Sequence, residues 1–113
     1  MSSKFIVRGG KLANGESADV AIVDGLISAV GANLTLEGSE EISALNSVVI
    51  PGLVDLHTHL REPGKEDAET VLSGSMAAAK GGYVAISAMA NTSPVADTAG
   101  VVEQVYALGQ SAG

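Results

Sequence analysis

The chain changes character at Val48-Val49-Ile50-Pro51-Gly52-Leu53-Val54-Asp55-Leu56-His57-Thr58-His59. Two apolar runs flank a Pro-Gly pair, and the second run leads directly into polar residues. A short, continuous apolar run bounded by turn residues is typical of a strand buried in a parallel sheet. The pattern predicts a strand over residues 53–56 that carries both histidines of the chain at its carboxyl end.

Strand and helix patterns alternate after this point. Residues 66–80 carry apolar or small side chains at spacings of three and four, which predicts an amphipathic helix, and Gly81-Gly82 predicts its end. Residues 83–89 predict a second strand and residues 99–108 a second helix. A strand-helix-strand-helix series predicts a parallel sheet. Two such units cannot close a barrel, so we expect the chain to be the front of a longer protein.

The residues before Val48 predict a separate β unit. Short apolar runs alternate with turn residues, which is the pattern of small antiparallel strands. Asp24-Gly25 lies between two apolar runs and predicts a hairpin, and Asn14-Gly15 predicts a second tight turn. The predicted fold class is therefore α/β, with a small N-terminal β unit over residues 1–47. The first two β/α units of a barrel, incomplete in this chain, follow over residues 48–113.

Composition excludes several classes of function. Six Lys and Arg against thirteen Asp and Glu give a net charge of −7, which repels nucleic acid and anionic membranes. The absence of Cys excludes disulfides and thiolate metal sites, so a metal must be held by nitrogen and oxygen ligands. No apolar run is long enough to span a bilayer, and the first residues lack the apolar core of a signal peptide. We expect a cytoplasmic protein.

His57 and His59 are the candidate metal ligands. Residues two apart on an extended strand share a face, so the two imidazoles project together and can chelate a divalent ion. Asp55 falls on the same face and is placed to orient the imidazoles. The alternative is that two polar residues leave a strand for solvent and that their spacing is a coincidence.

Polar residues near the ends of the predicted elements have local interpretations. Asn91 follows the second strand, on the same rim as His57, and is either a substrate contact or a turn residue. Asp97 is placed to cap the second helix. An acidic run predicts a loop and the first turn of the first helix, and comprises Glu62, Glu66, Asp67 and Glu69.

The stretch Pro51-Gly52-Leu53-Val54-Asp55-Leu56-His57-Thr58-His59-Leu60-Arg61-Glu62-Pro63-Gly64 resembles the first barrel strand of the cyclic amidohydrolases, and of the dihydroorotases in particular. The same family's order and spacing continue through Glu69-Thr70, Ser73-Gly74, residues 77–82 and residues 89–97. Residues 19–27 resemble its N-terminal β segment more loosely. Ala90 departs from the proline that the family usually carries before the asparagine.

The resemblance implies a TIM (β/α)8 barrel and a metal-dependent reaction. That reaction is the reversible hydrolysis of (S)-dihydroorotate to N-carbamoyl-L-aspartate in de novo pyrimidine biosynthesis. It implies that His57 and His59 bind Zn²⁺, with one or two ions per complete site, and that Arg61 and Asn91 bind the substrate carboxylate. The acid/base carboxylate and the other ligands are expected beyond Gly113, so the isolated chain is expected to be inactive.

Three alternatives stay open. The first is a noncatalytic dihydroorotase-like partner of a carbamoyltransferase, which the joint presence of His57, His59, Arg61 and Asn91 disfavours. The second is another cyclic amidohydrolase of the allantoinase or hydantoinase type, which the Arg61-Glu62-Pro63-Gly64 run disfavours. The third is a truncated gene record. The expected partner is a small-molecule substrate, and a homodimer or a carbamoyltransferase assembly is expected of the complete protein.

Overall fold

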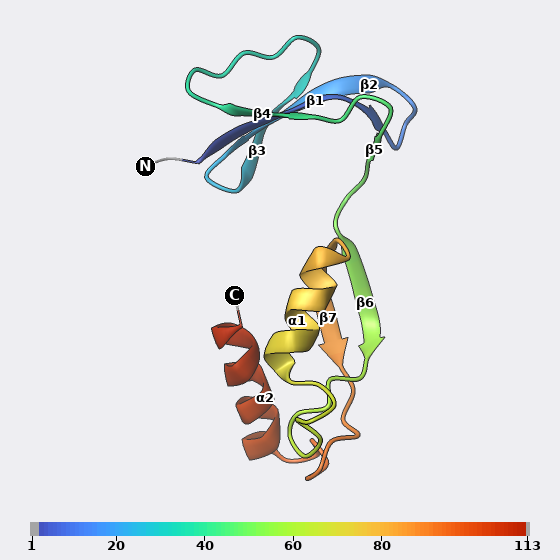
Figure 1. Cartoon of the computed structure of the whole chain (residues 1–113), viewed down its shortest axis with the longest axis vertical. Helices are drawn as coiled ribbons and strands as arrows, with labels where there is room; N and C mark the ends of the chain where they lie inside the picture. Colours follow the sequence, from blue (N-terminus) through green and yellow to red (C-terminus); the bar gives the residue numbers. More distant parts are fainter. Residues whose placement is uncertain (1–2, 113) are drawn as a thin grey trace. The chain divides into compact units, whose positions relative to one another are not determined.

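The computed structural model describes residues 3–112 and has an α/β fold. The chain consists of two compact units, Met1–Pro51 and Gly52–Gly113 (Figure 1). The sequence predicted the division between residues 47 and 48. The division lies after Pro51 because Val48 and Val49 pair with a strand of the first unit.

The first unit is a five-stranded sheet. Its strands are β1 (Lys4–Leu12), β2 (Ser17–Val23), β3 (Leu26–Gly31), β4 (Glu40–Ser43) and β5 (Val48–Val49). The order is β3-β2-β1-β4, and β5 also pairs with β1. The pairs β1–β2 and β2–β3 are antiparallel, as predicted. The expectation of antiparallel pairing throughout was wrong, because β4 and β5 return to β1 in parallel after the loop that follows β3.

Both predicted tight turns of this unit are confirmed. Asp24 and Gly25 connect β2 to β3 with φ values of 50° and 79°. Two consecutive positive φ values are what a two-residue hairpin requires to match the strand twist. Gly15, with φ of 89°, lies in the turn between β1 and β2. The local sequence therefore predicts both hairpins of the sheet.

A small apolar core and a polar network stabilise this sheet. The core consists of Ile6, Val20, Ala21 and Ala44. Beside it, Arg8 Nη1 donates to Asp19 Oδ2 at 2.8 Å and to the Leu34 carbonyl at 2.6 Å, and Arg8 also pairs with Glu41. Buried Asp19 accepts further hydrogen bonds from the backbone N–H groups of Gly9 and Leu34.

These contacts shift the ionisation of the network. The Gly9 N–H and then the Arg8 guanidinium hold the pKa of Asp19 below its ordinary value. Arg8 lowers the pKa of Glu41, and the two carboxylates raise the pKa of Arg8, Glu41 more than Asp19. The network is therefore charged and internally satisfied at neutral pH.

The second unit contains two parallel strands, each followed by a helix. They are β6 (Leu53–Thr58), α1 (Val71–Lys80), β7 (Tyr83–Ala88) and α2 (Ala99–Ser111). Parallel pairing of β6 with β7 confirms the predicted strand-helix-strand-helix series. Helix α1 packs against both β7 and α2 (Figure 1). The carboxyl ends of both strands consequently meet at one edge of the sheet.

Helix α1 begins later than predicted. Thr70 is its N-cap: Thr70 Oγ1 accepts from the Ser73 N–H, and Ser73 Oγ accepts from the Thr70 N–H. This reciprocal pair fixes the start of the helix. The acidic run therefore lies before the helix, and the prediction that it forms the first turn was wrong. The predicted end is confirmed, with Gly81 as the C-cap and Gly82 at a φ of 85°.

Helix α2 extends three residues beyond its predicted end and begins without a side-chain cap. Thr98 is its N-cap residue, and its side chain makes no capping hydrogen bond. The prediction that Asp97 caps this helix was wrong, because Asp97 lies one residue before the capping position. The start of α2 thus lacks the capping box that fixes α1.

Large apolar side chains of β6 and β7 are exposed within the second unit. Leu56 is 75% exposed and Val84 is 74% exposed. Buried apolar side chains in this unit include Leu60, after β6, and Val71, in the first turn of α1. No helix in residues 3–112 has the length and apolar character that crossing a membrane requires.

Candidate active site

Both histidines lie at the carboxyl end of β6. His57 is the second-last residue of β6 and is exposed, whereas His59 follows the strand and is half-buried. Their ring centroids are 5.1 Å apart, with an angle of 62° between the ring planes. The two-residue spacing thus places the imidazoles side by side, as the sequence predicted.

Asp55 has a different contact from the one predicted. Its Oδ1 accepts a hydrogen bond of 2.9 Å from the backbone N–H of His57. The expectation that this carboxylate orients an imidazole was wrong, because the carboxylate folds back onto the main chain of its own strand. Asp55 therefore stabilises the backbone that carries His57.

Asn91 is joined to His59 across 32 residues of sequence. The distance between His59 Nδ1 and Asn91 Oδ1 is 2.8 Å. Asn91 follows β7 and His59 follows β6, and parallel pairing brings these two strand ends together. The structure therefore connects two of the four predicted site residues by a direct side-chain hydrogen bond.

The loops that carry these residues are packed against each other. The Ser93 N–H donates to the Pro63 carbonyl at 2.9 Å. Gly64 adopts a φ of 108°, and a Cβ at this position would lie 2.3 Å from the Ser93 carbonyl oxygen. Only glycine fits this close approach without displacing the loop. The Gly64 N–H also donates to Glu66 Oε1 at 2.7 Å, which lowers the pKa of Glu66.

Arg61 is half-buried just beyond the histidines. Its guanidinium makes no hydrogen bond or ion pair with the residues that the structure describes, and no contact joins it to Asn91. Its backbone carbonyl accepts from the Lys65 N–H at 2.9 Å, which closes the loop.

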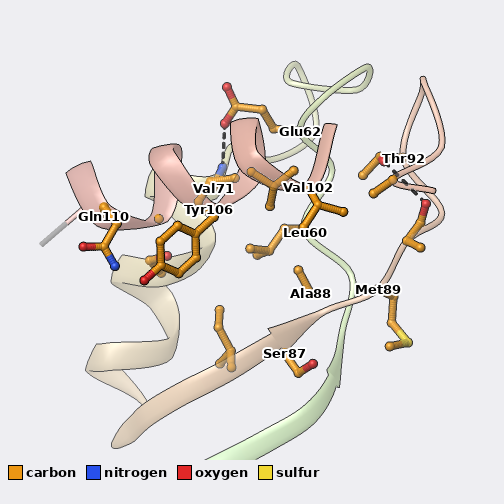
Figure 2. A pocket seen from close by; sticks show the side chains of 16 residues that line it. Leu60, Glu62, Val71, Ser87, Ala88, Met89, Thr92, Val102, Tyr106 and Gln110 are labelled. Atoms are coloured by element: carbon orange, nitrogen blue, oxygen red, sulfur yellow. Dashed lines mark hydrogen bonds between the residues drawn. The ribbon is translucent and has the colours of Figure 1, made fainter. Parts of the chain in front are cut away.

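Glu62 has a role that the sequence did not reveal. Its Oε2 accepts a hydrogen bond of 2.8 Å from the Val71 N–H, at the start of α1 (Figure 2). A carboxylate at this end of a helix is stabilised by the free N–H groups and the helix dipole. Residues nine apart show no periodic signal, so only the folded loop brings them together.

The donor set fits part of a metal site. Two neutral imidazoles are suitable ligands for Zn²⁺. Residues 3–112 contain no cluster of three or more His, Asp or Glu side chains that could hold an ion. A catalytic zinc site usually has three protein ligands. The described residues therefore include two neighbouring imidazoles whose chemistry suits zinc, and no third side chain of that kind beside them.

A cavity of about 430 Å³ lies in the second unit (Figure 2). It is lined by residues that include Leu60, Val71, Ser87, Val102 and Tyr106. None of the four predicted site residues lines it. The carboxylate of Glu62, at its border, is occupied by the Val71 N–H. The cavity is mainly apolar, and its lining includes neighbours of the site residues in sequence, Leu60, Ala90 and Thr92.

A family model described as dihydro-orotase-like matches residues 46–111. The chain belongs to the dihydroorotase-like family. The resemblance stated for the Pro51 to Gly64 motif and for residues 89–97 is thereby confirmed. The matched residues comprise the whole of the second unit from β6 to the end of α2.

Curated relatives extend this match over nearly the whole dihydroorotase-like chain. It is 61% identical over 111 residues to the dihydroorotase of Streptomyces coelicolor, covering 98% of this chain and 26% of the relative. It is 54% identical to the dihydroorotase of Leifsonia xyli, covering 96% and 25%. Identity to the Mycobacterium tuberculosis dihydroorotase is 51%, covering 88% and 23%. The chain spans about a quarter of the length of these relatives.

Solved structures of hydantoinases resemble the fold of this chain. An L-hydantoinase (dihydropyrimidinase) from Arthrobacter aurescens matches the dihydroorotase-like chain with a TM-score of 0.80 and 26% identity. The match covers 96% of this chain and 25% of that protein. A D-hydantoinase from Bacillus sp. AR9 matches with a TM-score of 0.75 and 32% identity, covering 93% and 24%.

Proposed function

We propose that the chain contributes His57, His59, Arg61 and Asn91 to the active site of a zinc-dependent dihydroorotase. The reaction is the reversible hydrolysis of dihydroorotate to N-carbamoyl-aspartate. The observation that carries this proposal is the meeting of the histidine pair with Asn91 at the carboxyl ends of β6 and β7. It occurs in a chain 61% identical to a dihydroorotase.

The strand ends also support a barrel architecture. In (β/α)8 barrels, active sites lie at the carboxyl ends of the parallel strands. The second unit has this connectivity, and its neighbours among solved structures are hydantoinases. We propose that Gly52–Gly113 contain the first two β/α units of such a barrel, β6-α1 and β7-α2.

The proposed roles follow from donor chemistry. His57 and His59 would hold Zn²⁺ through imidazole nitrogens. A zinc ion held there would supply Lewis-acid polarisation of the amide carbonyl and activation of the hydrolytic water. The acid/base carboxylate and the remaining ligands would come from outside the described residues. We therefore expect the 113-residue chain by itself not to hydrolyse dihydroorotate.

Arg61 would select the substrate. Dihydroorotate carries a carboxylate, and a planar guanidinium binds a carboxylate through two parallel hydrogen bonds. The guanidinium of Arg61 has no partner in the part of the chain that the structure describes. The side-chain NH2 of Asn91 is a second donor on the same rim. Both groups favour an acidic cyclic amide over a neutral one.

The test uses the native gene product, captured with an antibody against residues 55–64 and loaded with Zn²⁺. Its mass is measured, and its kcat/KM is compared for dihydroorotate and for dihydrouracil, which lacks the carboxylate. We expect a preference for dihydroorotate. Arg61→Lys keeps the charge but loses the paired hydrogen bonds, and should raise KM for dihydroorotate about 10- to 100-fold.

Two results would contradict the proposal. A native product that prefers dihydrouracil would indicate a hydantoinase-type enzyme, in keeping with the structural neighbours. A native product that binds Zn²⁺ but hydrolyses neither compound, and copurifies with a carbamoyltransferase, would indicate a noncatalytic partner.

A further inference from the structure

The hydrogen bond between His59 and Asn91 has a defined direction. Asn91 Oδ1 is a carbonyl oxygen and can only accept, so its 2.8 Å contact with His59 Nδ1 is a hydrogen bond in the tautomer that carries the proton on Nδ1. In a neutral imidazole with its proton on Nδ1, the lone pair is on Nε2. The contact thus selects the nitrogen of His59 that is available to a metal ion.

We propose that Asn91 is a positioning residue, which holds His59 in the Nδ1-protonated tautomer and presents Nε2 to the metal. The proposal rests on the function proposed above, because it assigns His59 as a metal ligand. An acceptor on the second ring nitrogen is the usual device that orients a metal-binding histidine. His57 differs, since its ring makes no hydrogen bond with the described residues.

The surrounding loops hold Asn91 in place for this role. The Ser93 N–H donates to the Pro63 carbonyl, and Gly64 packs against Ser93. On the other side of Asn91, the Ala96 N–H donates to the Ala90 carbonyl at 3.0 Å. The contacts of Ser93 join the Asn91 loop to the loop that follows His59, and the Ala96–Ala90 hydrogen bond closes the Asn91 loop on itself. The main chain that carries Asn91 is therefore held by hydrogen bonds on both sides, and the Asn91 side chain contacts His59.

One side chain can then serve two ligands. Asn91 Oδ1 is occupied by His59, whereas the amide NH2 has no hydrogen-bond partner in the described residues. The NH2 group can donate to the substrate carboxylate while the oxygen holds the histidine. Substitutions that separate the two ends of the amide therefore separate the two roles.

The first experiment measures the tautomer of His59 in the full 113-residue chain without metal. Long-range ¹H–¹⁵N NMR at a pH of about 9, where histidine is ordinarily neutral, reports which ring nitrogen carries the proton. We expect the proton on Nδ1 in the wild type and in Asn91→Asp, whose carboxylate also accepts. Asn91→Ala should lose this preference. A wild-type proton on Nε2, or an unchanged tautomer in Asn91→Ala, would overturn the proposal.

The second experiment measures Zn²⁺ affinity of the same variants by titration calorimetry. Loss of the acceptor in Asn91→Ala should weaken Zn²⁺ binding about 10- to 100-fold, and Asn91→Asp should restore it. Asn14→Ala is the matched control, because Asn14 is exposed and bonds to Glu16 in the first unit. Its affinity should equal that of the wild type. Equal affinity in Asn91→Ala, or no Zn²⁺ binding by the wild type, would contradict the proposal.

Failure of this proposal is distinguishable from failure of the proposed function. The tautomer and the metal affinity are measured without substrate. A chain with both expected effects, whose native product fails to hydrolyse dihydroorotate, contradicts the enzymatic proposal alone. Active native product whose Asn91→Ala variant keeps its tautomer and its Zn²⁺ affinity contradicts the positioning role alone.

Discussion

The two compact units use their polar side chains differently. In the small sheet, Arg8 pairs with both Asp19 and Glu41, and the Asp19 carboxylate also accepts from nearby backbone N–H groups. At the strand ends of the second unit, His59 has a single side-chain partner, and Arg61 has none among the described residues. Side chains satisfied within a unit stabilise it, and this contrast separates the polar network of the small sheet from the residues that we propose for the site.

The two units also differ in the contacts that stabilise their secondary structure. Hairpin geometry and a buried isoleucine define the small sheet, with Ile6 only 1% exposed. In the second unit, loop contacts and one capping box hold the elements that carry the site. Four experiments test this contrast, beginning with the one for which we expect the largest effect.

Replacement of the buried isoleucine should be the most destabilising. Ile6→Ala leaves a cavity in the sheet core and should reduce the free energy of unfolding by about 2–5 kcal/mol. Ile27→Ala is the matched control, because Ile27 is 69% exposed in the same unit. Hydrogen exchange of the β1 and β2 amides reports the loss. Equal protection in the two variants would refute the claim that Ile6 organises this sheet.

Substitution of the glycine between the site loops should come next. Gly64→Ala combines positive-φ strain with a clash against the Ser93 carbonyl, and should cost about 1–3 kcal/mol. Gly82→Ala carries similar strain, but its Cβ would meet nothing within 4 Å in the described structure. Tyrosine fluorescence during urea unfolding is a suitable probe, because both tyrosines, Tyr83 and Tyr106, lie in this unit. If the two variants lose equal stability, the loop contact is unimportant.

Removal of a helix cap should have a smaller effect. Thr70→Ala breaks the capping box of α1 and should cost about 1 kcal/mol. Thr98 occupies the same position in α2 without a side-chain hydrogen bond, so Thr98→Ala should change stability much less. The same tyrosine signal compares the two variants. A larger loss in Thr98→Ala would contradict the assigned start of α1.

Acidification should reduce the stability of the small sheet gradually, and we expect this effect to be the smallest of the four. The pKa values of Asp19 and Glu41 are lowered in the folded sheet, so their stabilisation is complete above their ordinary values of 3.8 and 4.5. It should decline as the pH falls below 4.5 and continue to decline below 3.8, as the carboxylates are protonated. Urea unfolding between pH 7 and pH 2.5, compared with Asp19→Asn, measures this. A variant with the same pH dependence as the wild type would exclude Asp19 as the cause.

Local patterns predicted most of the secondary structure. Asp24-Gly25 and Asn14-Gly15 predicted the two hairpins, and apolar spacing predicted both helices of the second unit. The predicted boundaries were wrong where a local side-chain contact or a partner distant in sequence determines where an element or unit begins. The Thr70 and Ser73 pair moved the start of α1, and pairing of Val48 and Val49 with β1 moved the division between the units.

The sequence by itself determined the family, the strand-helix series and the histidine pair at the end of β6, because turn residues, periodicity and two-residue spacing act between near neighbours along the chain. Only the tertiary structure decided the partners of these groups. His59 meets Asn91, Gly64 meets Ser93, and Glu62 meets Val71. Each contact joins residues separated along the chain and forms only where parallel strands and their loops bring them within hydrogen-bonding or packing distance.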